Sequence, residues 1–286
     1  IHSMDLKVYH RTEYQYSSSA RESINELKLN PRNTKFQTCK SAIVSVIPPA
    51  RPRPYVDLYG NRSHHIEIPE EHKRLVIEAR IRMVTKPTLS IDDYPYGVPM
   101  KSLKKLSYLE KSRLFLQSSP YVDVNPEIWR AAVDIMNDSN DVFQTSYAIM
   151  ESIYRDFEYM PGATVVTTHA NEVIKKKMGV CQDFAHSMVA YCRSLNIPTR
   201  YVSGYFFDAT RDQSLRGSEA THAWVEVYIE GSGWIGLDPT NNKVTDDTYI
   251  VLAVGRDYTD VAPISGSYYG GGTSSLIVNV AVGKVK

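Results

Sequence analysis

The sequence Thr221-His222-Ala223-Trp224-Val225-Glu226-Val227-Tyr228 is an alternating strand that decides the fold of the second half of the chain. Its histidine, tryptophan, glutamate and tyrosine share one face, whereas the alanine and the two valines point to the other. The turn residues Glu230-Gly231-Ser232-Gly233 follow, and then comes a second strand, Trp234-Ile235-Gly236-Leu237-Asp238. The segment therefore predicts a β-hairpin with one face packed on a core.

The length of the hairpin loop determines where Asp238 lies. With a three-residue loop, Trp224 faces Asp238, and His222 lies diagonally across from the carboxylate at ~7–8 Å between backbones, within side-chain reach. A four-residue loop without a bulge would place Asp238 on the opposite face. The alternative for Asp238-Pro239-Thr240 is that the aspartate only initiates a turn, which is a common arrangement.

Residues 181–195 form the clearest predicted helix, and Cys181 is its first residue. Apolar side chains recur along it at three-and-four spacing, and Pro198 ends it. Gly179 lets the backbone turn sharply before the cysteine. Unpaired backbone N–H groups and the positive end of the helix dipole favour a thiolate there, and they can donate to an oxyanion. The alternative is a small buried hydrophobic cysteine, which we expect for Cys192 on the apolar face of the helix.

A thiolate nucleophile needs a histidine that acts first as base and then as acid, and a third group that orients the imidazole. His222 is the candidate because it opens the strand nearest to a carboxylate. His186 points about 140° away from Cys181 around the helix, so we expect a structural hydrogen-bonding role. His169 lies in a loop that could approach any part of the fold. The other histidines belong to the N-terminal strands, their turns or the residues before Met4: His2, His10, His64, His65 and His72.

The first 86 residues predict a small all-β domain, best described as a sandwich. Asp5–Tyr16 alternates between apolar and polar residues, and Ser41–Ile47 and Leu75–Val84 are rich in β-branched residues. Turn-forming residues separate these runs. We expect a linker over residues 87–124, because prolines and a polar run begin there.

Helices followed by strands over residues 125–286 predict an α+β domain, with helices packed on an antiparallel sheet. Asn125-Pro126 starts a helix that reaches about Met136, and a second helix runs from roughly Asp141 through Phe157. The glycine-rich residues 265–272 are either a flap over a cleft or a connector to the last strand. Strands are predicted over residues 199–207, 222–229, 234–237, 249–254 and 276–282.

The 286-residue chain has an ordinary globular composition, with 42% hydrophobic residues, 23% charged residues and a formal net charge of +1. This balance gives no reason to expect a surface that coats nucleic acid or a membrane. Three scattered cysteines exclude a disulfide framework, and no apolar run approaches a membrane span. We interpret Ile1-His2-Ser3 as vector residues before a natural start at Met4, with no leader, and expect a cytoplasmic protein.

Three motifs that occur in one order resemble those of bacterial transglutaminase-like proteins. They are Gly179-Val180-Cys181-Gln182-Asp183, Thr221 to Val227, and Trp234 to Thr240. The resemblance covers about residues 148–254. The β region before it, with Tyr55-Val56-Asp57-Leu58-Tyr59-Gly60-Asn61, is similar to the N-terminal domain that is often joined to this core in bacteria.

The resemblance implies a papain-like transglutaminase core with Cys181 as nucleophile, His222 as acid and base, and Asp238 as orienting carboxylate. Gln182, or the backbone amide of Cys181, would serve the oxyanion. Other matching segments look like the lining of a cleft, and the alternative for each of their residues is plain scaffolding. The cleft candidates are Tyr159, Tyr205 and Trp224.

The sequence contains no H-E-x-x-H, paired C-x-x-C, P-loop or dinucleotide-binding glycine motif. We therefore predict no metal ion, nucleotide or redox cofactor. The absence of an EF-hand-like acidic loop also argues against a calcium requirement like that of animal transglutaminases.

Three functions stay open at this point. We favour a cysteine protease or amidase that hydrolyses peptide or glutamine-type amides, because water is always present whereas an amine site must be built. The second is transamidation, in which a lysine-type amine resolves the thioester. The third is a non-catalytic peptide-binding relative, against which the intact set of three residues argues. The expected partner is a peptide or protein substrate, with no nucleic acid and no membrane.

Overall fold

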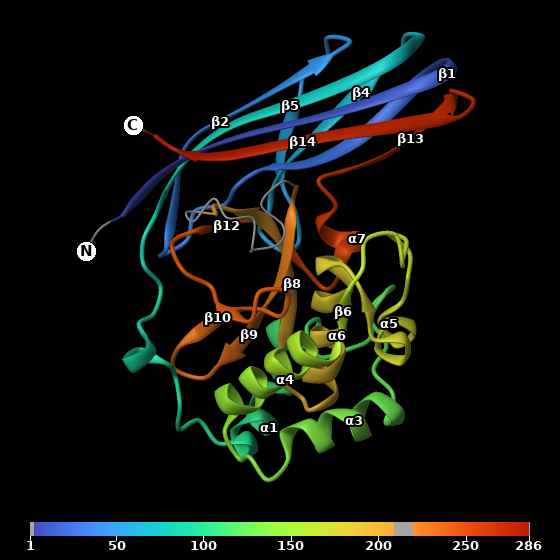
Figure 1. The fold of residues 1–286 in the computed structure, drawn as a ribbon. Helices are drawn as coiled ribbons and strands as arrows, with labels where there is room; N and C mark the ends of the chain where they lie inside the picture. Colours follow the sequence, from blue (N-terminus) through green and yellow to red (C-terminus); the bar gives the residue numbers. More distant parts are fainter. Residues whose placement is uncertain (1–2, 209–219, 286) are drawn as a thin grey trace.

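The chain folds into a β region that lies on a mixed core of helices and strands (Figure 1). A computed structural model describes residues 3–208 and 220–285. The first and last strands lie side by side, since Leu6 pairs with Lys284. Ile1 and His2, which we interpret as vector residues, fall outside the described residues.

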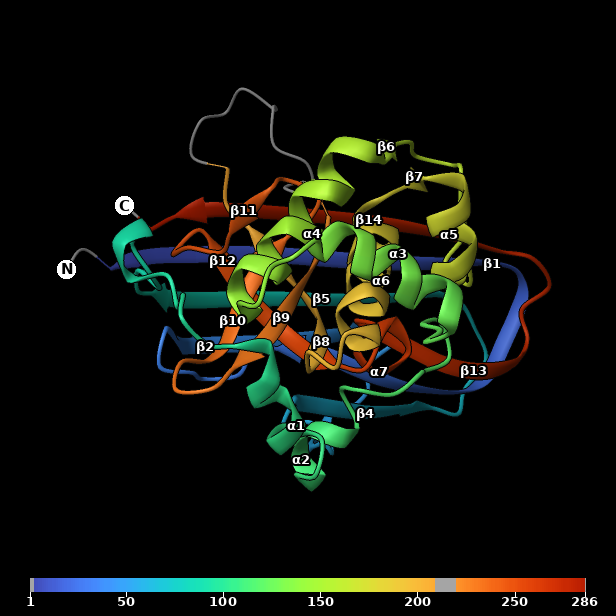
Figure 2. The ribbon, with the colours of Figure 1, turned by 90° about the horizontal axis from the view of Figure 1, so that it is seen from below.

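One long strand organises the β region. The first half of β1 (Met4–Asn30) pairs with β5 (His72–Thr85) and β14 (Ser274–Lys284), and its second half pairs with β4 (Arg62–Ile68) and β13 (Ile264–Gly270). Figure 2 shows β1 turning between the two halves. Five strands of the seven-stranded sheet follow the order β2-β5-β1-β4-β3, from β2 (Gln37–Ile47) to β3 (Arg53–Val56), and β13 and β14 pair with β1 beside this path.

Side chains from both halves of this sheet pack into one apolar cluster, as in a sandwich. Leu6 and Val8 come from the first half, and Leu27 and Ile66 from the second, and none is more than 3% exposed. Alternation along each strand sends these residues inward and polar residues outward. The N-terminal β region that the sequence predicts is therefore confirmed.

The glycine-rich residues 265–272 are part of the sheet. β13 covers most of them and pairs with β1, from Ile264 opposite Leu27 to Gly270 opposite Ala20. Positive φ angles of 76°, 81° and 60° at the three glycines 270–272 turn the chain into β14. The flap hypothesis is therefore wrong. The sequence groups these last strands with the domain 125–286, but their backbones pair with the N-terminal sheet.

The segment 87–124, predicted as a linker, packs onto the core. Leu103, Leu106 and Val122 are at most 5% exposed and belong to the core cluster. Such burial stabilises the segment in one position, unlike a free linker. Its helical turns are η1 (Ile91–Asp93), η2 (Met100–Ser102), α1 (Leu103–Leu106) and α2 (Glu110–Arg113).

The helices of the core begin where their capping residues predict. Asn125 accepts a hydrogen bond from the N–H of Ile128 at 2.9 Å, and Asp141 accepts one from Gln144 at 2.7 Å. No helix in the described ranges is long and apolar enough to cross a membrane. The helices are α3 (Pro126–Met136), α4 (Val142–Asp156), α5 (Ala170–Lys176), α6 (Cys181–Ser194) and α7 (Tyr258–Val261).

The core sheet is antiparallel, in the order β11-β10-β9-β8-β12, and α6 packs against β8 and β9. Seen from below, the helices lie in front of these strands and the long N-terminal strands lie behind them (Figure 2). This arrangement confirms the predicted α+β class. The strands are β8 (Thr199–Phe206), β9 (His222–Ile229), β10 (Gly233–Asp238), β11 (Lys243–Val244) and β12 (Tyr249–Gly255), with a separate parallel pair, β6 (Glu158–Tyr159) and β7 (Met178–Gly179).

The loop between β9 and β10 holds three residues. Gly233 pairs with Ile229 and Leu237 pairs with Val225, so residues 230–232 form the loop. The next position in this register sets Asp238 beside Trp224, on the face of the sheet that also carries His222. The three-residue loop that the triad requires is confirmed.

Side-chain amides of the N-terminal region close the free edge of the core sheet. β12 is an edge strand. Gln37 donates to the carbonyl of Val251 and accepts from its N–H, both at 2.8 Å. Asn61 makes the same two bonds with Val254, at 2.7 and 2.9 Å. Each amide replaces a neighbouring strand, so that the two parts of the molecule are fixed to each other.

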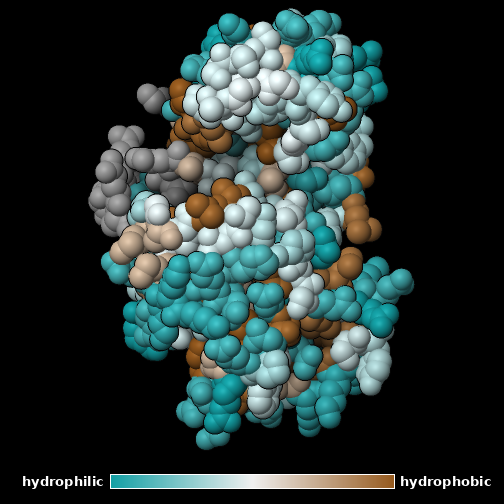
Figure 3. Space-filling view, turned by 90° about the vertical axis from the view of Figure 1, so that its right-hand side faces the viewer, coloured by the Kyte–Doolittle hydropathy of each residue, from teal (hydrophilic) through white to brown (hydrophobic). Residues whose placement is uncertain are grey.

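Elsewhere along this junction the surface is hollowed. In the side view, apolar residues gather around a hollow between the β region above and the core below (Figure 3).

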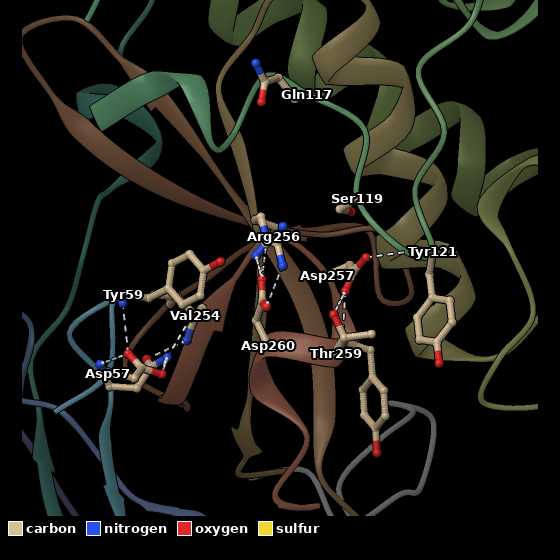
Figure 4. A network of polar contacts seen from close by, with 12 residues as sticks. Asp57, Tyr59, Gln117, Ser119, Tyr121, Val254, Arg256, Asp257, Thr259 and Asp260 are labelled. Carbon is tan, nitrogen blue, oxygen red and sulfur yellow. Dashed lines mark hydrogen bonds and ion pairs between the residues drawn. The ribbon is translucent and has the colours of Figure 1, made fainter. Parts of the chain in front are cut away.

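A polar network extends from these amide contacts into the core (Figure 4). Asp57 accepts from the side chain of Asn61 at 2.9 Å. Beyond β12, Arg256 pairs with Asp260 at 2.9 Å, and Asp257 accepts from the backbone N–H of Tyr121 at 2.8 Å. These contacts connect the β region, the end of β12 and the segment before α3.

We expect Asn61→Ala to destabilise the protein by about 2–5 kcal/mol, because it leaves the buried N–H and carbonyl of Val254 unpaired. Chemical denaturation measures this difference. The matched control is Asn279→Ala, on the exposed face of β14, which we expect to change stability by less than about 0.5 kcal/mol. Equal effects of the two substitutions on stability would show that the amide of Asn61 does not fix the N-terminal region to β12.

Candidate active site

The start of α6 fixes the position of Cys181. The carboxylate of Asp183 accepts hydrogen bonds from the N–H of Val180 at 2.8 Å and from the hydroxyl of Thr164 at 2.6 Å. A Cβ on Gly179 would lie 2.5 Å from this carboxylate, so glycine is needed for close packing and not for the sharp turn expected from the sequence. Cys181 is partly exposed. The first N–H groups of the helix have no partner within the helix.

His222 and Asp238 form a buried pair at the ends of adjacent strands. Nε2 of His222 lies 2.7 Å from Oδ2 of Asp238, and both side chains are 0% exposed. Burial by itself lowers the pKa of His222, but the charge and hydrogen bond of Asp238 outweigh it and raise the pKa to about 10. Burial raises the pKa of Asp238, and the charge and hydrogen bond of His222 reverse this and lower it. Each partner therefore stabilises the charged form of the other.

The second ring nitrogen of His222, Nδ1, is available to Cys181. It is buried and has no regular hydrogen bond among the residues that the structure describes. Cys181 lies close enough to this ring to raise the pKa of His222 further, although less than Asp238 does. Cys181 therefore lies near the ring, without a regular hydrogen bond to Nδ1. The structure brings together the sulfur, the imidazole and the carboxylate.

Asp238 also accepts hydrogen bonds from residues that the sequence pattern does not single out. Tyr249 donates its hydroxyl to Oδ2 at 2.7 Å, and Asn241 donates its side-chain amide at 3.0 Å. The N–H of Thr240 donates to Oδ1 at 2.9 Å, so Asp238 initiates a turn and also pairs with His222. Asn241 could have been found as part of that turn. Tyr249 lies on another strand, and no local signal identifies it.

Aromatic rings enclose this pair. The ring centroid of Trp224 lies 5.8 Å from that of His222 and 5.1 Å from that of Tyr249. Trp224 is only 1% exposed, so it covers the imidazole and does not form an open wall beside the sulfur. Excluding water in this way strengthens the electrostatic interaction within the pair.

The other three residues proposed for the oxyanion site or the cleft are engaged in different contacts. Tyr205 is fully buried, and its hydroxyl lies 2.8 Å from Nδ1 of His10, between the sheet and the core. The cleft role of Tyr205 is therefore wrong, because the N-terminal region covers this end of β8. Gln182 donates to the carbonyl of Val166 at 2.8 Å. Tyr159 is partly buried. Its strand β6 pairs with β7, where Tyr159 lies opposite Gly179, which precedes Cys181 by two residues.

The remaining candidates have structural positions. His186 accepts from the N–H of Tyr258 at 3.1 Å, as expected for a structural histidine, and burial lowers its pKa to about 4. His169 is half-exposed and lies 3.7 Å from Asp123. Cys192 is fully buried, and burial raises its pKa to about 12. In residues 3–208 and 220–285, no group of three or more histidine, cysteine, aspartate or glutamate side chains is placed to hold a metal ion.

Comparisons with known proteins give the same two parts. Residues 130–239 match the transglutaminase-like superfamily, and residues 6–84 match the bacterial transglutaminase-like N-terminal region. An uncharacterized protein of Mycobacterium leprae is 31% identical over 280 residues, which make up 97% of this chain and 98% of that protein.

A solved structure and an enzyme extend the comparison. The crystal structure of a candidate cysteine protease from Cytophaga hutchinsonii is 25% identical, with a TM-score of 0.79, and the match covers 100% of this chain and 92% of that one. A protein-glutamine gamma-glutamyltransferase of Pseudomonas aeruginosa is 29% identical over 102 residues, which are 33% of this chain and 15% of that protein.

We expect the stabilisation from the His222–Asp238 pair to depend on pH. The raised pKa of His222 gives stability that is full below its unfolded value of about 6.5 and is lost as the pH rises through about 10. The lowered pKa of Asp238 gives stability that is lost as the pH falls below its unfolded value of about 3.9. Asp238→Asn should therefore destabilise most between about pH 5 and 6.5, and less toward pH 10.

Chemical denaturation of the protein and of Asp238→Asn over this pH range measures the effect. The control is Glu172→Gln, which removes one carboxylate of an exposed pair with Lys176 and should have a small effect at every pH. A loss of stability in Asp238→Asn that did not change with pH would contradict the ion pair.

Proposed function

Because the chain belongs to the transglutaminase-like superfamily, which includes cysteine proteases and transglutaminases, we propose that it is a cysteine-dependent hydrolase. The proposed substrates are peptide or glutamine-type amides. The observation that carries the proposal is the buried His222–Asp238 pair beside the partly exposed Cys181. A sulfur nucleophile, an imidazole that moves a proton and a carboxylate that orients the imidazole are the parts that acyl transfer needs.

In the proposed first step, the proton shared between Cys181 and Nδ1 of His222 lies on the ring, and the sulfur attacks the carbonyl carbon of the amide. The N–H groups at the start of α6, which include that of Cys181, donate to the oxygen as it becomes negative. The imidazolium then protonates the leaving nitrogen as the C–N bond breaks, and a thioester remains on the sulfur.

In the second step, His222 takes a proton from water, and the resulting hydroxyl attacks the thioester. The C–S bond then breaks, the acid product leaves, and the imidazolium of His222 returns its proton to the sulfur. Asp238 holds Nε2 throughout and stabilises the imidazolium, and Tyr249 and Asn241 hold Asp238 by donating to its carboxylate.

Hydrolysis and transamidation share the first step and differ in what attacks the thioester. The gamma-glutamyltransferase of Pseudomonas aeruginosa resembles only 33% of this chain, whereas the candidate protease of Cytophaga hutchinsonii matches 100% of it. The broader resemblance supports hydrolysis as the first choice. A non-catalytic binding role would leave the buried pair and the partly exposed Cys181 without a use.

We expect iodoacetamide at about pH 6.5 to label Cys181 faster than Cys39 or Cys192. Burial raises the pKa of both Cys39 and Cys192. Cys181 instead lies near His222, whose pKa is raised by Asp238, so that a positively charged ring favours the thiolate. His222→Ala should slow the labelling of Cys181 by at least about tenfold. Mass spectrometry of the digested protein measures each rate.

His169→Ala is the matched control for that experiment, because it removes a half-exposed imidazole away from the thiol. Its labelling rate should equal that of the unmodified protein. Equal labelling of Cys39 and Cys181, or an unchanged rate in His222→Ala, would count against an activated thiol.

We expect a glutamine-containing peptide incubated with an excess of a primary amine to give mainly acid, either glutamate or cleaved peptide. Cys181→Ala should reduce the product to the uncatalysed level, because no thioester can form. Mass spectrometry separates the acid from the amine adduct. If the adduct predominates, transamidation replaces hydrolysis. If neither product forms with a broad peptide library, the non-catalytic alternative is favoured.

A further inference from the structure

A cavity lies on the face of the core sheet opposite α6. It has a volume of about 310 Å³, and neither Cys181 nor His222 lines it. Strands β8 to β10 form its floor, and residues 32–37 and 85–89 of the N-terminal region form its walls. Trp224 and Glu226 line it, and they follow His222 at every second position along β9, on the same face of the strand. The cavity is therefore a neighbour of the candidate active site and is separate from it.

The cavity contains more positive than negative charge. Arg200 pairs with Glu226 at 2.9 Å, and these side chains are only 15% and 13% exposed. Arg32 lies close enough that the charge of Arg200, after burial, lowers the pKa of Arg32. Arg32 donates to the carbonyl of Tyr59 at 3.1 Å and makes no ion pair with any residue in the described ranges. The carboxylate of Glu226 is thus paired with Arg200, and the charge of Arg32 has no carboxylate partner among the described residues.

The remaining charged groups do not cancel this excess. Lys35 and Lys86 also line the cavity. The other acidic residue that lines it, Asp246, is paired with Lys243 at 3.0 Å. An anion between Arg32 and Arg200 would gain charge-assisted hydrogen bonds in a partly desolvated place.

Aromatic and aliphatic side chains make up much of the lining. The guanidinium of Arg200 lies over the ring of Trp234, 4.2 Å from its centroid, so that a flat apolar surface adjoins the positive charge. An inorganic anion would leave this surface without a partner, whereas an anion with an apolar body would cover it. The apolar lining residues include Phe36, Leu89, Trp224, Trp234, Tyr249 and Val251.

We propose that this cavity binds an apolar carboxylate, with its carboxylate between Arg32 and Arg200 and its apolar body against Leu89 and Trp234. A small organic acid and the C-terminal residue of a peptide both have this chemistry. The bound molecule would touch Tyr249, whose hydroxyl donates to Asp238. The site does not depend on the proposed hydrolysis.

Tryptophan fluorescence tests the proposal directly, because two of the three tryptophans line the cavity. Trp129, on α3, is 48% exposed and is replaced in Trp129→Phe to remove its signal. This variant is titrated with 3-phenylpropanoate and its neutral amide, and with acetyl-alanyl-phenylalanine and its C-terminal amide. We expect saturable binding of an acid and at least roughly tenfold weaker binding of its amide.

The tighter of the two acids identifies the source of the carboxylate. Arg32→Gln should weaken binding of that acid by at least about tenfold, and Arg21→Gln, an exposed arginine outside the cavity, should leave binding unchanged. Acids and amides that bind equally, or an absence of saturable binding, would overturn the proposal without any arginine variant. Unchanged affinity in a folded Arg32→Gln protein would overturn it too.

Discussion

The register between β9 and β10 is the constraint on which the candidate active site depends. Side chains alternate along a strand, so a shift of one residue would send the carboxylate of Asp238 to the helical face of the sheet. His222 would then be a buried imidazole without a charged partner, which is costly. The three-residue loop at 230–232 prevents this and places Nε2 of His222 2.7 Å from Asp238. The length of the loop 230–232 thus determines whether β9 and β10 can bring an imidazole and a carboxylate together.

The N-terminal region supports the same pair from a distance. Tyr249, which holds and covers Asp238, lies at the start of β12, and the free edge of that strand is bonded by Gln37 and Asn61. The proposed carboxylate cavity uses the same junction, since its walls come from both parts of the chain. The β region therefore contributes to the environment of the active site, although none of its residues is proposed to act in the reaction.

Local patterns predict much of this structure and fail where distant segments meet. Strand alternation and two glycines around a short loop predict the β9–β10 hairpin, and capping residues predict the helix starts. The pairing of β13 with β1 joins residues about 240 positions apart, and a glycine-rich run carries no alternation that indicates it. The cleft role predicted for Tyr205 fails for a related reason, since its strand pattern does not show that the N-terminal region covers that end of β8. Tyr249 was missed because only the folded sheet brings it to Asp238.

The protonation of His222 is the most direct measure of whether the sulfur, the imidazole and the carboxylate act as one unit. Titration of the ring nitrogens by ¹⁵N NMR, in the protein and in Cys181→Ala, reports it. The geometry predicts that the ring stays charged at a pH well above its ordinary pKa of about 6.5. It also predicts that the pKa of His222 is lower once the sulfur is removed. A ring that titrates near its ordinary value, and does so equally in both proteins, would contradict the triad.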